Sequence, residues 1–429
     1  MNRAQSQAYL GHLQRFGIRL GLDAIREILA GLGNPQGRFP SVLVAGTNGK
    51  GSVCAMLDAI LAAHGFRVGL YTSPHLVRVE ERIQVGRQLI PARSLGRLLG
   101  RIKETNEALL AAGRLTAEPT FFEVLTAAAF LYFAERRVDI AVLEVGLGGR
   151  FDATNAVRPL ATAITSIGHD HQQYLGRTLS RIAAEKAGII KPGVPVVCGV
   201  RPGSAAHAVI RRRAEELDAP FIGVFDGGRL EAAPGRGRFV FRRAGRSYRF
   251  APGLAGGHQG ENAAVAILVA EELGRSWRPL QKSRVIAGVE RAHWEGRLES
   301  VSVRPPVILD GAHNEEGAAA LAAHLRRTFK ERVVLVLGVL RDKDVRALTR
   351  HLFPLAAAVV LTRVPGERGA TPEEIAALAP AFRGRLWLEP DPRRAVRLAR
   401  RESGGRIPMI ITGSLFLVGE VKRLRLFPV

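Results

Sequence analysis

The chain repeats one pattern, a short run of apolar residues followed by a stretch with helical periodicity. In the first half the helical stretches lie at about 52–64 and 121–136. The apolar runs are at 41–45, 67–71, 138–145, 161–167 and 194–198. Strands that are apolar on both faces and separated by helices are typical of a parallel sheet covered on both sides. We therefore predict a mostly parallel α/β domain.

The second half changes character twice. Apolar and polar residues alternate within 220–250, which predicts antiparallel hairpins, and a helix is expected at about 262–273. The segment 294–304 has no strong periodicity and precedes Pro305 and Pro306. Beyond it we expect strands at 307–309, 333–337, 358–362 and 408–412 and helices at 316–328 and 371–378. This predicts two domains, 1–296 and a smaller α/β domain, 297–429.

The chain is strongly basic, with 62 Lys and Arg against 39 Asp and Glu, a formal net charge of +23. Such a charge suggests either a polyanionic partner such as nucleic acid or a general preference for arginine. Only 8 of the 62 are Lys, the Arg pairs are scattered, and aromatic residues make up 6%. We favour the general preference and expect no nucleic-acid partner.

Cys54 and Cys198 are the only cysteines, and both lie in apolar surroundings. They form no CxxC pair, which indicates a reducing compartment. The first residues contain no apolar core of a signal peptide, and no apolar run reaches 18 residues. We expect a cytoplasmic chain without a membrane partner.

The first apolar run leads directly into Gly46-Thr47-Asn48-Gly49-Lys50-Gly51-Ser52 and a helix. Glycines let a backbone wrap an anion, and a helix N-terminus presents free N–H groups to it. Lys50 supplies a charge for outer phosphates and Ser52 a hydroxyl for a metal ion. The segment departs from GxxxxGK[ST], because Val44 takes the first glycine position and Gly51 separates Lys50 from Ser52. The strand–loop–helix context nevertheless predicts phosphate binding rather than a plain turn.

Polar residues also follow other apolar runs, where ligands of open α/β sheets bind. Glu144 ends one run, and with a phosphate loop nearby Mg²⁺ ligation is a better interpretation than a buried ion pair. His169, Asp170 and His171 follow another run. Thr72-Ser73-Pro74-His75 alone indicates a turn. Asp310 and His313 follow a strand of the second domain, either as helix-capping residues or at a cleft facing the first domain.

Lys186 lies in an apolar helical patch, 182–190. It is either a solvated lysine paired with Glu185 or a buried lysine with a lowered pKa that could become nucleophilic. The residues alone leave both alternatives open.

Together these motifs resemble the folylpolyglutamate synthase / dihydrofolate synthase branch of the Mur-ligase-like ATP-dependent amide ligases. The resemblance is nearly full length and is carried by LGNPQ (32–36), AGTNGKGS (45–52), SPHL (73–76), LEVGLGGRFDATN (143–155), DH (170–171), YLGRTL through IIKPG (174–193), WEGRLE (294–299), LDGAHN (309–314), DKD (342–344) and TGSLFLVGEV (412–421). Two positions depart from the pattern: Glu295 replaces a frequent Pro, and His169 replaces an apolar residue. These departures bear on substrate preference more than on the chemistry.

The resemblance implies an ATP-dependent ligase that adds L-glutamate to dihydropteroate, or further γ-linked glutamates to reduced folates, through an acyl phosphate. It implies an N-terminal ATP- and folate-binding domain, a C-terminal glutamate ligase domain and a monomer. ATP would be held by Thr47, Asn48, Gly49, Lys50, Gly51, Ser52, Asn262, Arg297 and Asp310. Mg²⁺ would be held by Ser52, Ser73, Glu144 and His171, and the pterin substrate by Thr120, Phe121, Phe122, Glu123, Phe151, Asp152 and Ala153. Lys50, Lys186 and His313 would lie at the reaction, with Lys186 matching a lysine that CO2 carboxylates in this family.

Two other functions remain open from the sequence. A Mur-type ligase that adds an amino acid to a peptidoglycan precursor would share the phosphate loop, and an added N-terminal UDP-binding domain would favour it; about 40 residues precede the loop. A regulatory phosphate-loop module without ligase activity would not need polar strand ends on both domains.

Overall fold

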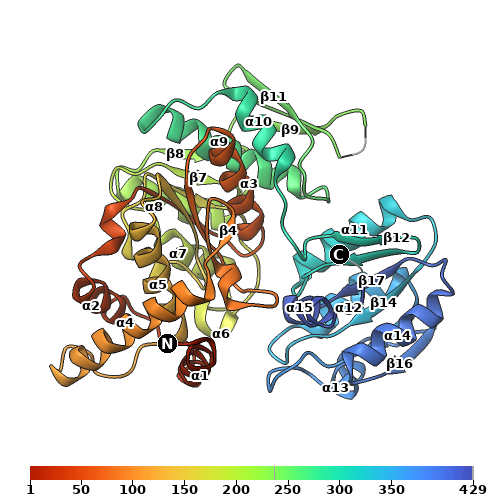
Figure 1. Cartoon of the computed structure of the whole chain (residues 1–429). Coiled ribbons are helices and arrows are strands. Elements are labelled where there is room, and N and C mark those ends of the chain that lie inside the picture. The colour runs from red at the N-terminus through yellow and green to blue at the C-terminus, as the bar shows by residue number, and fades with distance from the viewer. Residues whose placement is uncertain (236, 428–429) are drawn as a thin grey trace.

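The computed structural model describes residues 1–235 and 237–427. These residues form two α/β bodies, each built on its own sheet, together with a small antiparallel sheet. The two bodies lie side by side, the first coloured red to green and the second teal to blue (Figure 1). The mixed α/β architecture predicted from the apolar runs is confirmed.

The first body contains an eight-stranded sheet in the order β4-β3-β2-β5-β1-β6-β7-β8. Its strands are β1 Ser41–Ala45, β2 Val68–Tyr71, β3 Ile83–Val85, β4 Gln88–Leu89, β5 Ile140–Glu144, β6 Ala161–Ile164, β7 Val196–Cys198 and β8 Phe221–Gly223. Six strands are parallel, whereas β3 and β4 form an antiparallel hairpin at one edge. The strand β1 pairs with both β5 and β6, so the loop that follows it lies at the middle of the sheet.

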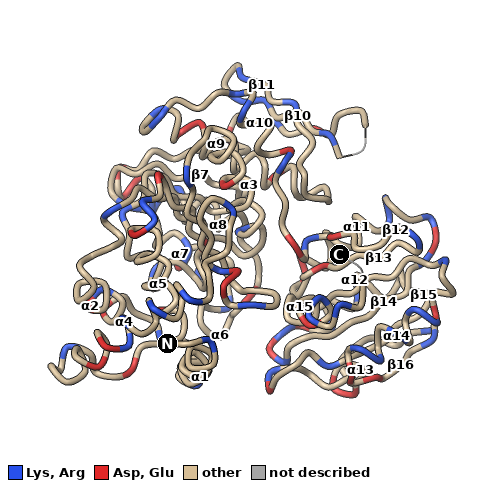
Figure 2. Tube along the Cα trace, viewed as in Figure 1, with Lys and Arg blue, Asp and Glu red and all other residues tan. Residues whose placement is uncertain are grey.

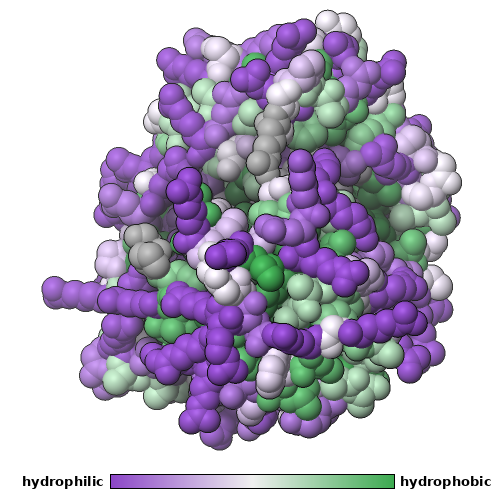
Figure 3. Space-filling view, turned by 90° about the vertical axis from the view of Figure 1, so that its right-hand side faces the viewer, coloured by the Kyte–Doolittle hydropathy of each residue, from purple (hydrophilic) through white to green (hydrophobic). Residues whose placement is uncertain are grey.

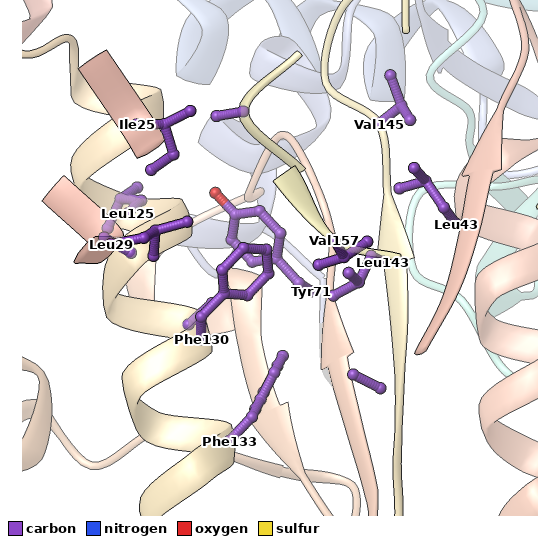
Figure 4. Packing of buried hydrophobic residues seen from close by; sticks show 14 of the residues in the cluster. Ile25, Leu29, Leu43, Tyr71, Leu125, Phe130, Phe133, Leu143, Val145 and Val157 are labelled. Atoms are coloured by element: carbon purple, nitrogen blue, oxygen red, sulfur yellow. The ribbon is translucent and has the colours of Figure 1, made fainter. Parts of the chain in front are cut away.

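Helices cover both faces of this sheet, because alternate residues of its strands are apolar on both sides. Leu43 and Leu143 face the cluster shown in Figure 4, where Phe130 and Phe133 pack against Tyr71. That face is covered by α1 Arg3–Gln14, α2 Asp23–Gly31, α4 Ala92–Ala111, α5 Phe121–Glu135, α7 Leu179–Ala187 and α8 Ala205–Glu216. The opposite face is covered by α3 Lys50–Ala63, α9 Gln259–Ser276 and α10 Lys282–Arg291. Shorter helices are η1 Pro35–Arg38, η2 Val79–Arg82, η3 Ala153–Ala156 and α6 Gln172–Leu175.

The segment 220–250 is divided between two sheets. Its first strand, β8, pairs in parallel with β7 at the edge of the large sheet, so the prediction of hairpins throughout this segment is wrong there. The remainder forms the predicted antiparallel sheet of β9 Gly228–Ala232, β10 Phe239–Arg243 and β11 Arg246–Phe250. Phe241 and Tyr248 pair across this sheet and pack into the core beneath α9.

The second body contains a six-stranded sheet in the order β12-β13-β17-β14-β15-β16. Its strands are β12 Glu299–Val303, β13 Pro306–Leu309, β14 Val333–Leu337, β15 Ala356–Leu361, β16 Arg385–Leu388 and β17 Met409–Thr412. All pairs are parallel except β12 with β13. The helices α11 Glu315–Thr328, α12 Val345–Leu352 and α13 Pro372–Leu378, with η4 Phe353–Leu355, pack on one face, and α14 Pro392–Ser403 and α15 Leu415–Arg423 on the other.

The chain passes from the first body to the second between α10 and β12. Segment 294–304, which lacks sequence periodicity, contains the edge strand β12 rather than only a connection. No described helix combines the length and apolar character that a membrane crossing requires. Lysine and arginine are spread along both bodies instead of gathering on one surface (Figure 2).

Candidate functional site

The loop between β1 and α3 lies at the carboxyl edge of the first sheet. Gly49 has a φ of +86°, and a Cβ atom there would lie 2.3 Å from Asn262 Oδ1. The hydroxyl of Thr47 bonds both the N–H (3.0 Å) and the carbonyl (3.1 Å) of Gly168, which anchors the loop to the segment after β6. Glycine is therefore required where the loop meets α9, and the loop is held open for an anion at the start of α3.

Two lysines share one acceptor beside this loop. The Nζ atoms of Lys50 and Lys186 each donate to the carbonyl oxygen of Gly46 at 2.9 Å. Lys186 is 4% exposed, so of the two alternatives for this residue the buried one is correct. Burial, together with the charge of Lys50, lowers the pKa of Lys186 to about 7. Near neutral pH a substantial fraction of this amine is uncharged and nucleophilic.

Glu144 ends β5 and is 4% exposed. Its Oε2 accepts the Ser73 N–H at 3.0 Å, and burial raises its pKa while the Lys50 charge opposes that rise. His171 follows β6, and burial lowers its pKa to about 4, so its imidazole is neutral at pH 7. Ser52 accepts a bond from Gln259 Nε2 at 3.3 Å.

The four residues named as metal ligands, Ser52, Ser73, Glu144 and His171, all line one cavity of about 340 Å³. It is also lined by the predicted nucleotide residues 47–51, Asn262, Arg297 and Asp310, and by Lys186 and His313. In the part of the chain that the structure describes, no three acidic, His or Cys side chains group as a metal cage. One carboxylate with hydroxyls and phosphate oxygens is nevertheless a donor set that suits Mg²⁺, which keeps few protein ligands.

The second body closes one side of this cavity. Asp310, at the end of β13, accepts the N–H groups of Leu298 (2.9 Å) and Ala312 (3.0 Å), so it stiffens the crossing segment. Asn314 exchanges two side-chain amide bonds with Asn48, at 3.0 and 3.3 Å. Asp310 and His313 therefore face the first body, and it is Asn314 that caps α11, through the Gly317 N–H.

A buried ion pair also joins the bodies. Lys343 Nζ lies 2.6 Å from Asp170 Oδ1, with side chains 8% and 11% exposed, and His313 Nε2 lies 3.4 Å from Asp170 Oδ2. These contacts of His313 and Lys343 hold the pKa of Asp170 well below its usual range, despite its burial. Asp170 thus carries a full negative charge at neutral pH and attracts the cations of the second body.

A second, more apolar cavity of about 360 Å³ adjoins the first. Of the predicted substrate residues, Thr120, Phe122, Glu123, Phe151, Asp152 and Ala153 line it. Phe121 is not in this lining; its ring packs against the Arg82 guanidinium, 5.1 Å from the ring centroid. The carboxylates are satisfied within the protein, since Glu123 accepts from Thr120 and Asp152 accepts the N–H groups of Gly146, Leu147 and Thr154.

Several residues of this cavity carried no motif in the sequence. The loop 17–21 supplies Ile18 and Leu20, 49% and 48% exposed, and Arg82 and Arg368 also line the cavity, beside Phe416 from the motif at 412–421. The one signal that marks the loop is a pair of apolar residues placed between Gly17 and Gly21. Arg82 is nearly buried and donates through Nε to His75 Nδ1 at 2.8 Å.

Comparison with known proteins identifies the family. Residues 44–270 match the Mur ligase middle domain, and residues 296–415 match the Mur ligase glutamate ligase domain. The chain is 38% identical to dihydrofolate synthase/folylpolyglutamate synthase of Bacillus subtilis, over 95% of this chain and 96% of that protein. The chain belongs to the folylpolyglutamate synthase / dihydrofolate synthase family. Like its relatives in this family, it is an ATP-dependent ligase that forms amide bonds.

Solved structures of this family agree over the whole chain. The Escherichia coli protein in complex with DHPP and ADP superposes with a TM-score of 0.89, 29% identity and coverage of 99% of this chain and 97% of that one. The Yersinia pestis bifunctional folylpolyglutamate synthase/dihydrofolate synthase, complexed with AMPPNP and Mn ion, superposes with a TM-score of 0.87 and 31% identity. The match covers 99% of this chain and 98% of that one. These relatives favour the folate ligase over the peptidoglycan alternative, and they support the use of ATP and a divalent metal ion.

The two departures from the family pattern are not in the lining of the polar cavity, although Glu295 lines a neighbouring cavity together with Ser73 and Glu144. Glu295 Oε2 lies 2.8 Å from Lys422 Nζ, which also contacts Glu299 Oε1 at 2.7 Å, so the crossing segment is tied to α15. The backbone N–H of His169 donates to Glu316 Oε1 at 3.3 Å, across the two bodies. In this family member, both residues therefore contact residues of the second body.

Proposed function

We propose that the chain joins L-glutamate to dihydropteroate, or extends reduced folates with γ-linked glutamates, using ATP. The observation that carries this proposal is that the polar and apolar cavities meet. They share Ser73, Pro74, Gly146, Leu147, His171, His313 and Leu415. An apolar ring system in one cavity would therefore bring a terminal carboxylate to a γ-phosphate held in the other.

In this proposal the loop 47–52 and Lys50 bind the ATP phosphates, with Asn262, Arg297 and Asp310 around the rest of the nucleotide. Ser52, Ser73, Glu144 and His171 would hold Mg²⁺, which neutralises phosphate charge when bound. Lys186, whose pKa is about 7, supplies the neutral amine that carbamate formation with CO2 requires. Its carboxylated form would add a second anionic metal ligand beside Gly46.

The substrate carboxylate attacks the γ-phosphate, which gives an acyl phosphate and ADP. The glutamate amine then attacks the acyl carbon, and phosphate leaves from the tetrahedral intermediate. The protein contributes chiefly by positioning the reactants and by neutralising charge with Lys50 and nearby arginines. Closure of the second body excludes water that would hydrolyse the acyl phosphate. His313, which lines both cavities, is placed where the amine arrives.

The decisive assay uses purified protein with ATP, Mg²⁺ and labelled glutamate, offered dihydropteroate and tetrahydrofolate separately. Glutamate-dependent phosphate release with either acceptor is the expected result, and the two arms show which additions occur. A UDP-sugar peptide acceptor is the matched negative control. Turnover with that peptide alone would favour the Mur-type ligase, and nucleotide binding without any turnover would favour a regulatory module.

A further inference from the structure

The outer edge of the second sheet is unpaired in the described chain. The strand β16 pairs with β15 on one side and with no strand on the other. All four of its residues are exposed, with Leu386 at 41%, Trp387 at 39% and Leu388 at 46%. Figure 1 shows β16 at the border of the blue body, and Figure 3, which faces that side, shows apolar areas between hydrophilic side chains.

Exposed edge strands template pairing with other chains, and proteins usually protect them with charges, prolines or a covering helix. Here three large apolar residues occupy consecutive edge positions, and the flanking Arg385 and Glu389 have opposite charges. The other edge strand of the same sheet, β12, instead carries Ser300 and Ser302, and Lys422 contacts its first residue, Glu299, at 2.7 Å. The strand β12 also carries Val301 and the 78% exposed Val303, but serines separate them, so of the two edge strands of this sheet β16 is the one with three consecutive apolar residues.

The backbone of β16 determines which groups are free. Glu389, directly after the strand, donates its N–H inward to the carbonyl of Leu361 at 3.0 Å. Inward- and outward-pointing backbone groups alternate along a strand. The N–H and C=O groups of Leu386 and Leu388 therefore point away from β15, toward the open edge.

We propose that β16 pairs antiparallel with β16 of a second copy of this chain, about a two-fold axis at Trp387. In this register Leu386 lies opposite Leu388 of the second copy, and their outward backbone groups form the hydrogen-bonded pairs. Trp387 lies opposite its own equivalent. Arg385 lies opposite Glu389 of the second copy, on the same face as the tryptophans.

The second copy is the occupant that this sequence fits, because the five residues RLWLE complement themselves when reversed. An aromatic pair at the centre and an opposite-charge pair on each side are favourable cross-strand contacts. Arg385 contacts Glu402 of its own chain at 3.2 Å, and a guanidinium with five N–H groups can hold a second carboxylate as well. Residues 385–389 lie outside the lining of both cavities of the ligase site, so the pairing strand itself covers neither cavity. This proposal is an alternative to the expectation of a monomer, and the experiments below distinguish the two.

Complementary charge variants test the register. The unmodified chain is expected to show a concentration-dependent mass approaching twice 46.4 kDa by light scattering. The proposed dimer contains two cross-strand pairs of residue 385 with residue 389. Arg385→Glu or Glu389→Arg puts like charges in both pairs, so each variant should weaken self-association roughly tenfold or more. An equimolar mixture of these two variants restores both ion pairs and should form a mixed dimer. Val303→Arg, on the opposite edge strand, is the matched control and should leave the dimer intact.

Cross-linking gives a second, independent test. Trp387→Cys places two thiols opposite each other on the axis, within the range of a disulfide. Leu388→Cys places them two positions apart in register. The native Cys54 and Cys198 are buried, so the background is low. We expect oxidation to link the Trp387→Cys chain and not the Leu388→Cys chain. A monomer throughout the concentration series, a dimer that Val303→Arg dissociates, or equal linking of both cysteine variants would overturn the proposal.

Discussion

At the scale of single residues, the proposed site contains ionisable side chains that are buried away from water. Lys186, Glu144 and Asp310 are each less than a tenth exposed, yet each is ionisable. Such groups cost stability unless they are paired or bind a ligand, and buried ionisable groups beside a cavity are candidates for a functional role. For two of them this argument gives direct experiments.

Lys186→Arg tests the carbamate, because arginine keeps the positive charge but offers no amine to CO2. Burial lowers the pKa of Lys186 to about 7, so the neutral amine fraction rises as pH increases from 6 to 8. At a fixed concentration of dissolved CO2, native mass spectrometry should show the adduct increasing over this interval. It should be absent from Lys186→Arg and retained in Lys191→Ala, which removes a less buried lysine. An adduct that persists in Lys186→Arg would place the carbamate elsewhere.

Glu144→Gln tests the proposed metal site. The amide keeps the side-chain shape but removes the charge, so turnover should fall by about a hundredfold or more. Because the buried carboxylate no longer needs desolvating, the Tm without ligand should stay the same or rise. MgATP should raise the Tm of the unmodified protein and raise that of the variant much less. Near-normal turnover in the variant would remove Glu144 from the site.

The sequence was sufficient to find residues that follow apolar runs, because each such run ends at the same edge of a sheet. Lys50, Glu144, His171 and Asp310 were singled out in this way. The loop 17–21 was not, since its one charged residue, Arg19, and its two apolar residues match no motif, and only tertiary packing brings the loop to the apolar cavity. Phe121 was assigned to that cavity, but its helical position turns it toward Arg82.

At the scale of elements, helix starts contribute to both stability and the site. The helices α5 and α13 begin with the same device, in which Thr120 and Thr371 cap the helix and Glu123 and Glu374 return a bond to the cap. Only the first of these capping boxes lines a cavity. Comparing variants of the two capping boxes therefore distinguishes a purely structural role from a role in substrate binding.

Thr371→Ala should lower the free energy of unfolding by about 1 kcal/mol, the usual cost of losing such a cap, and leave KM unchanged. Thr120→Ala should lower the free energy of unfolding by at least as much, because the buried Glu123 carboxylate also loses the hydroxyl donor that lies 2.7 Å from it. It should in addition raise KM for the pterin substrate. Chemical denaturation and steady-state kinetics measure the two effects. An unchanged KM in Thr120→Ala would separate this cap from the substrate site.

Elements with strong periodicity were predictable, and marginal ones were not. The runs at 41–45 and 333–337 are apolar except for Ser41, and they form the fully buried strands β1 and β14 as expected. The strand β12 was not predicted, because its more and less exposed positions do not alternate regularly. Its pairing with β13 also shifts in register between Ser300 and Ser302. The strand β8 was grouped with the hairpins that follow it, since three residues carry too little pattern to show their partner.

At the scale of the whole molecule, the arrangement of the two bodies decides whether a complete site exists. Their contacts include specific polar ones, above all the ion pair between Lys343 and Asp170, and Leu76 of the first body packs against the core of the second. No sequence pattern gives the relative placement of two separately folded sheets. The sequence nevertheless located polar strand ends on both, which is what made a shared cleft a reasonable expectation.

Lys343→Met is expected to lower turnover roughly tenfold or more, because misplacing one body relative to the other disturbs the alignment of reactants. It leaves Asp170 without its closest cation, so backbone hydrogen exchange near residues 168–171 should increase. The pKa of Asp170 is depressed in the folded state, so its contribution to stability is present above the usual aspartate pKa and is lost only as pH falls below it. Lys330→Met, on the exposed connection before β14, is the control. Equal activity of both variants would show that the ion pair does not position the bodies.

The paired amides of Asn48 and Asn314 connect the tip of the phosphate loop to the helix start of the other body. Through this bridge, occupancy of the loop and the posture of the second body become linked equilibria. If a bound triphosphate strengthens the Asn48–Asn314 contact by some factor, formation of that contact strengthens triphosphate binding by the same factor. We therefore expect binding at the loop and the position of the second body to be coupled through two short side chains that take no part in the bond being made.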